Sequence, residues 1–287
     1  MKMLMENIIF RINHINKTFG SESSTEKVEV IKDISMDIFA KEFVVILGSS
    51  GCGKSTFLKI LGGIIPASSG SIEFNGKNYG QEIPRDVLKK FGFVFQSNNL
   101  LQWRTTEGNL KFMLEMMNLK GEKWLARIDE MLDIVGLKAY KKVYPHELSG
   151  GMKQRVGIAR ALVHDPDVLI LDQPLGALDA ITRKMLSYEI LHIWKKTQKT
   201  VIMVTNNVDE ALLLANRIFV LSPTLPATVT HEIIVDIPLD ARDENIYENR
   251  RFNELREQIN DIVRSTMQEG GKELEQHDCS KKEENRK

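Results

Sequence analysis

The segment GSSGCGKST at positions 48–56 matches the pattern G-x-x-x-x-G-K-[ST], which binds nucleotide phosphates. Its glycines let the backbone curl so that N–H groups point toward phosphate oxygens, and a following helix adds partial positive charge. Lys54 can reach the β- and γ-phosphates, and the Ser55 hydroxyl can ligate Mg²⁺. The predicted phosphate-binding residues are Gly48, Ser49, Ser50, Gly51, Cys52, Gly53, Lys54, Ser55 and Thr56. No His or Asp partnership visible in the sequence marks Cys52 as a nucleophile, so we interpret it as a tolerated small residue.

A second chemical group follows the apolar run 168–171, where Asp172 is the next residue. An acid at the carboxyl end of a parallel strand lies where such sheets bind ligands. It could alternatively be a residue that only ends a strand. Because a phosphate-binding loop is also present, we predict that Asp172 and Ser55 serve a Mg²⁺ ion.

The elements that must position these residues alternate between strand and helix. Residues 43–47 form a short continuous apolar run, typical of a buried parallel strand, and residues 168–171 and 201–205 repeat that pattern. Helical patterns follow at 56–61, 180–196 and 209–216, and residues 107–140 are helical in character, with Gly136 able to end a helix. Strands are also expected near 8–12, 34–38, 72–74, 91–95, 218–221 and 229–237, and an amphipathic helix near 252–262.

The composition narrows the class of protein. The chain of 287 residues carries 39 Lys plus Arg and 39 Asp plus Glu, so its net charge gives no general attraction to nucleic acid or anionic lipid. No apolar stretch is long enough to span a bilayer, and we find no signal-peptide pattern. Two cysteines are too few for a disulfide framework and fit a reducing compartment. We therefore expect a cytoplasmic globular protein.

The segment LSGGMKQR at 148–155 lies between the phosphate-binding loop and Asp172. That order resembles the ATP-binding subunit of ATP-binding cassette transporters, and the resemblance covers essentially residues 8–265. It implies an α/β fold: a P-loop nucleoside triphosphatase core with a mostly parallel sheet, an N-terminal antiparallel β subdomain and a helical insertion. It also implies a cassette domain over 1–267, with a helical subdomain at about 97–147, and we expect the charged tail 268–287 to be disordered.

The resemblance assigns further residues to the site. Phe19 would stack on the adenine of ATP, and Gln96 would touch Mg²⁺ and couple to a membrane partner. Ser149, Gly150 and Gly151 would bind the γ-phosphate of ATP held by a second subunit, and Asp179 would lie at the interface of the two. From its own residue type, Ser149 could instead be an ordinary helix N-cap. The segment 96–103, with apolar Leu100, Leu101 and Trp103, and the helical insertion would dock on a membrane subunit. Met113, Met116 and Met117 fit helix core better than this surface.

Two positions depart from the family pattern. The residue after Asp172 is Gln173 where an active member has Glu, and Asn206 stands where a histidine is expected. An amide cannot accept a proton at neutral pH, so general-base help is lost at Gln173, and Asn206 can donate a hydrogen bond only as a neutral group. We predict a chain that binds MgATP but hydrolyses it poorly. It would act either as half of a heterodimer or as a slow homodimer.

The function implied by the resemblance is the ATPase of a membrane importer. The segment LLQWRT after residue 99, the RIFVLSP strand and the closing helix are similar to subunits for nitrate, sulfonate, taurine and related solutes. The expected partners are a second ATP-binding subunit, a polytopic permease and, indirectly, a solute-binding protein, but no nucleic acid. The expected location is peripheral, at the cytoplasmic face of the membrane. An alternative is a soluble ATP-dependent switch acting on a non-transport partner, and a kinase would leave LSGGMKQR unexplained.

Overall fold

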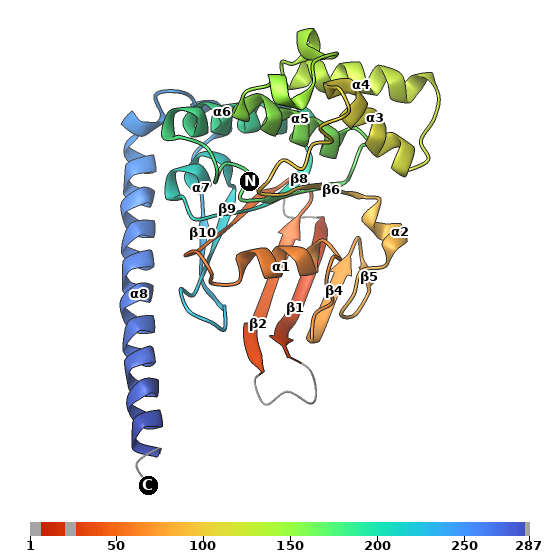
Figure 1. Cartoon of the computed structure of the whole chain (residues 1–287). Helices are drawn as coiled ribbons and strands as arrows, with labels where there is room; N and C mark the ends of the chain where they lie inside the picture. The colour runs from red at the N-terminus through yellow and green to blue at the C-terminus, as the bar shows by residue number, and fades with distance from the viewer. Residues whose placement is uncertain (1–6, 21–26, 285–287) are drawn as a thin grey trace.

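The computed structural model describes residues 7–20 and 27–284, with side chains up to Met267 (Figure 1). The polar segment 20–27, between the strands expected near 8–12 and 34–38, falls mostly outside these residues, as does the chain end at 285–287. Among the residues that are described, no helix is long and apolar enough to cross a membrane.

A six-stranded sheet forms the centre of the molecule, in the order β10-β9-β3-β8-β7-β6. Its strands are β3 (Phe43–Leu47), β6 (Phe91–Val94), β7 (Val168–Asp172), β8 (Thr200–Thr205), β9 (Arg217–Leu221) and β10 (Val229–Ile234). All neighbours pair in parallel except β10, which runs antiparallel to β9 at one edge. β3, β7, β8 and β9 are buried along their whole length, which explains why their sequences are continuous apolar runs.

A second, antiparallel sheet contains β2-β1-β4-β5. Its strands are β1 (Ile8–Phe19), β2 (Val28–Phe39), β4 (Ser69–Phe74) and β5 (Lys77–Asn78). In β2, for example, Ile34, Met36 and Ile38 are buried while Ser35 and Asp37 between them are more exposed, the alternation of a sheet covered on one face. The predicted combination of a mostly parallel core, an N-terminal antiparallel sheet and a helical insertion is confirmed.

The helices are α1 (Lys54–Leu61), α2 (Arg85–Leu88), α3 (Thr106–Met116), α4 (Glu122–Ile134), α5 (Gly150–Leu162), α6 (Ala180–Thr197), α7 (Val208–Leu214) and α8 (Arg250–Glu284). The helical stretch expected at 107–140 is divided into α3 and α4 because Asn118 and Gly121 take left-handed backbone angles between them. Gly136, also left-handed, follows the end of α4 as predicted.

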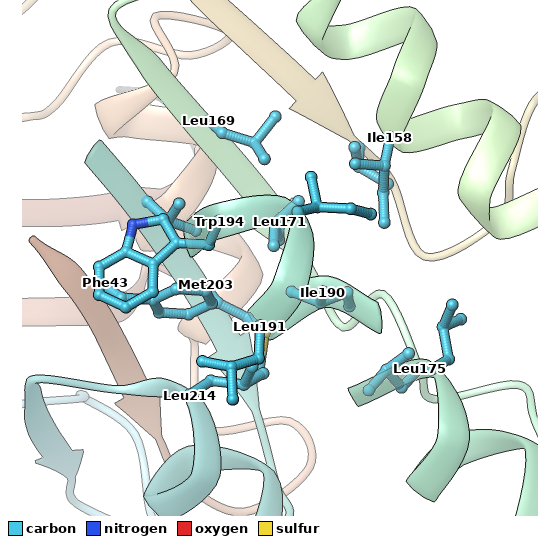
Figure 2. Packing of buried hydrophobic residues seen from close by; sticks show 14 of the residues in the cluster. Phe43, Ile158, Leu169, Leu171, Leu175, Ile190, Leu191, Trp194, Met203 and Leu214 are labelled. Carbon is cyan, nitrogen blue, oxygen red and sulfur yellow. The ribbon is translucent and has the colours of Figure 1, made fainter. Parts of the chain in front are cut away.

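Alternate residues of the parallel strands belong to two different cores. Val44 and Ile46 of β3 pack with α1 and the antiparallel sheet, whereas Phe43, Val45 and Leu47 face α5, α6 and α7. Figure 2 shows the second of these cores, where the Phe43 ring meets the Trp194 indole edge-on at 5.4 Å. The parallel sheet therefore separates α1 on one face from α5 and α6 on the other.

Helix α8 closes the chain and runs along one side of the molecule (Figure 1). Phe252, Leu255 and Ile259 anchor its first turns in the core near α7. The backbone stays helical to Glu284, past the start of the tail expected to be disordered. Because the side chains from 268 onward are not described, the proposed boundary between 267 and 268 stays a prediction.

Candidate functional site

The phosphate-binding loop joins β3, at the centre of the sheet, to the N-terminus of α1. Gly51 and Gly53 have φ values of +83° and +105°, a region that side chains with a Cβ rarely adopt. A Cβ on Gly53 would also lie 3.1 Å from the Val30 carbonyl oxygen. The motif glycine at 53 is thus required by backbone angle and by packing against β2.

Lys54 is 2% exposed and its ammonium lies inside the loop. The Nζ atom donates hydrogen bonds to the carbonyl oxygens of Gly48, at 2.9 Å, and Ser49. Burial lowers the pKa of Lys54 below its ordinary value, while nearby Cys52 and Asp172 oppose that shift. Cys52 is also buried, and its Sγ lies 3.9 Å from the Nζ atom. The thiol therefore packs beneath the loop, consistent with its interpretation as a small tolerated residue.

Ser55 and Asp172 meet although 117 residues separate them in the sequence. The Ser55 hydroxyl donates a 2.8 Å hydrogen bond to Asp172 Oδ1 at the end of β7. β8 lies between β3 and β7, so the two strand ends open on the same edge of the sheet. A hydroxyl and a carboxylate fit Mg²⁺, which takes few protein oxygens and completes its shell with water and phosphate. Within the described residues no cluster of three or more His, Cys, Asp or Glu side chains could hold a metal by itself.

Gln173 and Gln96 are brought to the same place. Gln173 follows β7 with a left-handed φ of 44°, and its N–H donates to Val204 O at 3.1 Å. A Cβ built on Gly176 would lie 3.5 Å from Gln173 Oε1 and 3.6 Å from Gln96 Nε2. The two amides therefore flank one point beside Asp172, with Gln96 exposed on the segment after β6.

Asn206 is exposed in the turn between β8 and α7. The residues around it are held firmly: Thr205 Oγ1 donates to Glu210 Oε2 at 2.6 Å, and Asn207 caps α7 by accepting from the Glu210 N–H at 3.0 Å. Asn206 is thus an exposed side chain on a fixed turn, next to the strand end that receives the Gln173 N–H.

Ser149 and Asp179 are both helix N-caps. Ser149 Oγ accepts from Met152 N at 3.2 Å at the start of α5, and Asp179 accepts from Ile181 and Thr182 at the start of α6. The backbone hydrogen bond from Thr182 is the main cause that lowers the pKa of Asp179. These caps confirm the ordinary interpretation of Ser149 and leave room for a second role, since both residues are exposed.

The glycines after Ser149 pack against the start of α6. A Cβ on Gly150 would lie 3.2 Å from Leu178 Cδ2, and one on Gly151 would lie 3.3 Å from Thr182 Cγ2. The segment 148–155 and the loop before α6 are therefore neighbours in one chain. We call residues 148–155 the signature segment. Helices α5 and α6 lie on the opposite face of the sheet from α1, so the signature segment belongs to a different layer from the phosphate-binding loop.

Phe19 ends β1 and is 44% exposed, with Lys17 Nζ 5.0 Å from the centre of its ring. An exposed aromatic ring at a strand end leaves one face available for stacking.

Comparison with known proteins identifies the family. The ABC transporter family model matches residues 31–176. The taurine import ATP-binding protein TauB of Jannaschia sp. (strain CCS1) is 40% identical over 236 residues, covering 81% of this chain and 85% of the relative. The aliphatic sulfonates import ATP-binding protein SsuB of Bacillus subtilis (strain 168) is 45% identical over 205 residues, covering 71% and 76% of the two chains. This chain belongs to the ABC transporter family.

A solved structure is also similar to this ABC cassette. The dimeric, post-hydrolysis state of the ATP-binding cassette MJ0796 bound to ADP and Pi superposes with a TM-score of 0.67. Its sequence is 29% identical, and the match covers 80% of this chain and all of that one. The fold assigned above is therefore the fold of an ATP-binding cassette.

The segment 96–103 of the cassette differs in part from expectation. Trp103 is 74% exposed, but Leu100 is only 7% exposed and packs into the core, so the prediction of a surface position is wrong for Leu100. Leu100 lies between exposed Asn99 and half-buried Leu101 because the chain turns inward there, where Asn109 bonds both the N–H and the carbonyl of Leu101. In α3, Met113 packs against the core as expected, but Met116 is 69% exposed, so the prediction of a core position is wrong for Met116.

Arg183 in α6 and Glu210 in α7 were not predicted from the sequence, yet they lie between the loop before α6 and the turn that carries Asn206. A signal was present, since Asn207 and Glu210 have the spacing of an N-cap residue and the acidic residue three positions later. In the structure the Glu210 carboxylate bonds Thr205 instead of the N-cap backbone. That difference depends on the strand end, which the local pattern does not encode.

Proposed function

We propose that this chain is the ATP-binding subunit of a membrane importer for a sulfonate such as taurine, or a related small solute. The observation that carries the proposal is the division between two layers. The phosphate-binding loop and the Ser55–Asp172 pair open from one edge of the sheet, while the capped signature segment starts a helix of the opposite layer. Two cassettes facing each other would bring one chain's loop against the other's signature. The names of the relatives, taurine and aliphatic sulfonate import proteins, support the solute class.

In this proposal the residues take the following roles. Phe19 stacks on adenine, and residues 48–56 hold the phosphates with their N–H groups and Lys54. Ser55, Asp172 and Gln96 hold Mg²⁺, which when bound neutralises charge on the β- and γ-phosphates. Ser149, Gly150 and Gly151 contact the γ-phosphate of the partner's ATP, and Asp179 lies at the interface. Gln173, whose left-handed φ of 44° follows directly after β7, would orient the attacking water with its side-chain amide.

We also infer that the hydrolytic site is degenerate. The Gln173 side chain can accept and donate hydrogen bonds but cannot take a proton from water, and Asn206 offers a neutral donor where a cation would stabilise developing charge. Binding residues are retained, so the chain holds MgATP and turns it over slowly. Measuring ATPase activity of the purified chain alone tests this, and robust turnover would contradict it.

The importer role requires a membrane partner that supplies the spanning helices. We place the chain peripherally on the cytoplasmic face, bound to a polytopic permease through Trp103 and the helical insertion, with a solute-binding protein acting on the far side. An exposed indole is a common anchor at the centre of protein interfaces.

Isolation of the tagged full chain from detergent-solubilised membranes tests this proposal. A polytopic permease should co-purify, and Trp103→Ala should lower its recovery. Ile234→Ala, which removes an exposed apolar side chain from the distant edge strand β10, is the matched control and should not. Association with ribosomes or another soluble complex instead of a permease would favour the regulatory switch.

A further inference from the structure

Two loops important to the proposed site are connected by side chains that have no part in binding nucleotide. One is the interface loop, defined here as residues 173–179 between β7 and α6, and the other is the switch turn, residues 205–207, which runs from the last residue of β8 to the start of α7. A cleft of about 330 Å³ lies between α6 and α7 and is lined by Arg183, Asn207, Glu210 and Tyr247 among others. Arg183 and Glu210 meet at this cleft.

The Arg183 guanidinium reaches from α6 to the interface loop. Its Nη2 atom donates a 3.0 Å hydrogen bond to the carbonyl of Leu178, the residue before Asp179. Its Nε atom lies 3.6 Å from Glu210 Oε1. Nε is buried and makes no hydrogen bond within the described part of the chain. A shift of about 0.5 Å would turn this ion pair into a hydrogen bond.

Glu210 reaches the switch turn from the other side. It is 6% exposed, and its second oxygen, Oε2, accepts the 2.6 Å hydrogen bond from Thr205. The same hydroxyl oxygen accepts from the Asn207 N–H at 3.1 Å, so the carboxylate orients both residues that flank Asn206. Burial raises the pKa of Glu210, while Thr205 and Arg183 favour its charged form.

We propose that Arg183 and Glu210 are positioning residues that couple the switch turn to the interface loop. The path runs from Asn207 and Thr205 through the Glu210 carboxylate and the Arg183 guanidinium to Leu178, next to Asp179. A γ-phosphate contact at Asn206 would thereby change the position of the interface loop, which lies on the surface that meets a second cassette. This inference rests on the proposed function, because it needs MgATP at the phosphate-binding loop. It assigns a role to two residues that touch neither the nucleotide nor the partner.

A purely structural ion pair joining α6 to α7 would have different consequences. Such a pair would affect stability without linking the response of one loop to the other, and buried pairs are weak contributors to net stability. The chain offers a matched comparison, since Arg256 on α8 pairs with Asp209 of the same helix α7 at 3.1 Å. That pair contacts neither Leu178 nor Thr205.

Hydrogen exchange of the full chain with and without MgATP tests the coupling, followed in peptides covering 173–179 and 205–210. Glu210→Gln keeps an oxygen for Thr205 but removes the charge that attracts Arg183. Arg183→Gln removes the guanidinium from Leu178; its side chain is 31% exposed, so this variant carries the test if Glu210→Gln fails to fold. Arg256→Gln is the control. MgATP affinity is measured in parallel by calorimetry.

In the wild-type chain MgATP should slow exchange in both peptides. Both test variants should retain MgATP affinity and the slower hydrogen exchange that MgATP causes in peptide 205–210. In peptide 173–179 the factor by which MgATP slows exchange should fall by about fivefold or more. Arg256→Gln should behave as wild type. The coupling is overturned if both test variants keep the response at 173–179, or if Arg256→Gln loses it equally. A wild-type chain that does not bind MgATP overturns the proposed function, and the coupling with it.

Discussion

The residues proposed to bind nucleotide and those proposed to hydrolyse it are held very differently. Lys54 and Asp172 are buried, and Ser55 bonds Asp172 directly, so this side of the site is fixed by the protein itself. Asn206 is an exposed side chain in the turn after β8, and Gln173 follows β7 with a left-handed φ of 44°. If the proposed roles hold, the groups that bind phosphate and Mg²⁺ are built into the sheet edge, whereas the two side chains that set turnover lie on the loops that follow β7 and β8.

The largest effect is expected from reversing the two departures from the family pattern. Gln173→Glu combined with Asn206→His should raise turnover by about 10²–10⁴-fold, because general acid–base help contributes that much in many enzymes. Steady-state phosphate release with saturating MgATP measures the change. Gln81→Glu, at an exposed site away from the strand ends, is the control for added charge. No increase in the double variant would mean that other groups limit the rate.

The binding side can be tested by removing the buried ammonium. Lys54→Ala should weaken MgATP binding by about 10- to 100-fold, since hydrogen bonds to charged groups contribute about 1.5–3 kcal/mol. Calorimetric titration measures the affinity. Lys59→Ala, on the same helix but outside the loop, should retain wild-type binding. Equal affinity in both variants would place the nucleotide elsewhere.

Ser149 tests whether the signature segment acts within its own chain. Ser149→Ala should lower the free energy of unfolding by about 1 kcal/mol through loss of the N-cap of α5. Affinity of the isolated monomer for MgATP should not change, because the phosphate-binding loop lies in the other layer. Urea titration and nucleotide binding give the two quantities, with Ser265→Ala in α8 as a control that removes a hydroxyl from a helix interior. A fall in monomer affinity would show that both motifs serve one site.

The smallest effect is expected from the acid that supports the switch turn. Because burial raises the pKa of Glu210, the native state keeps a proton that the unfolded chain has already released. The free energy of unfolding should therefore fall as pH rises from about 4.5 through the folded-state pKa, and level off above it. Glu210→Gln should remove part of this decline in the free energy of unfolding. Glu42 should contribute to the part that remains, because burial raises its pKa as well. Denaturant unfolding across this range measures the profile. An unchanged slope in Glu210→Gln would show that its carboxylate titrates normally.

Much of the fold could be predicted because its signals are local. The continuous apolar runs at β3, β7 and β8 predicted buried parallel strands, and the glycine after α4 predicted a helix end; both are confirmed. The division of 107–140 into two helices was less visible, because left-handed angles at Asn118 depend on packing as well as on residue type. Leu100 was misplaced for a related reason, since its burial follows from Asn109 turning the backbone inward.

By itself, the sequence determined which chemical groups this protein has: the lysine and hydroxyl of a phosphate-binding loop, a strand-end carboxylate, a signature segment, and amides in place of a glutamate and a histidine. Those depend on residue type and short spacing alone. Only the tertiary structure decided which of them meet. It brought Ser55 within hydrogen-bond distance of Asp172 and placed Gln96 near Gln173. It also placed the Arg183–Glu210 ion pair between the interface loop and the switch turn. Such contacts arise because strands distant in the sequence pair side by side, so their ends share one edge.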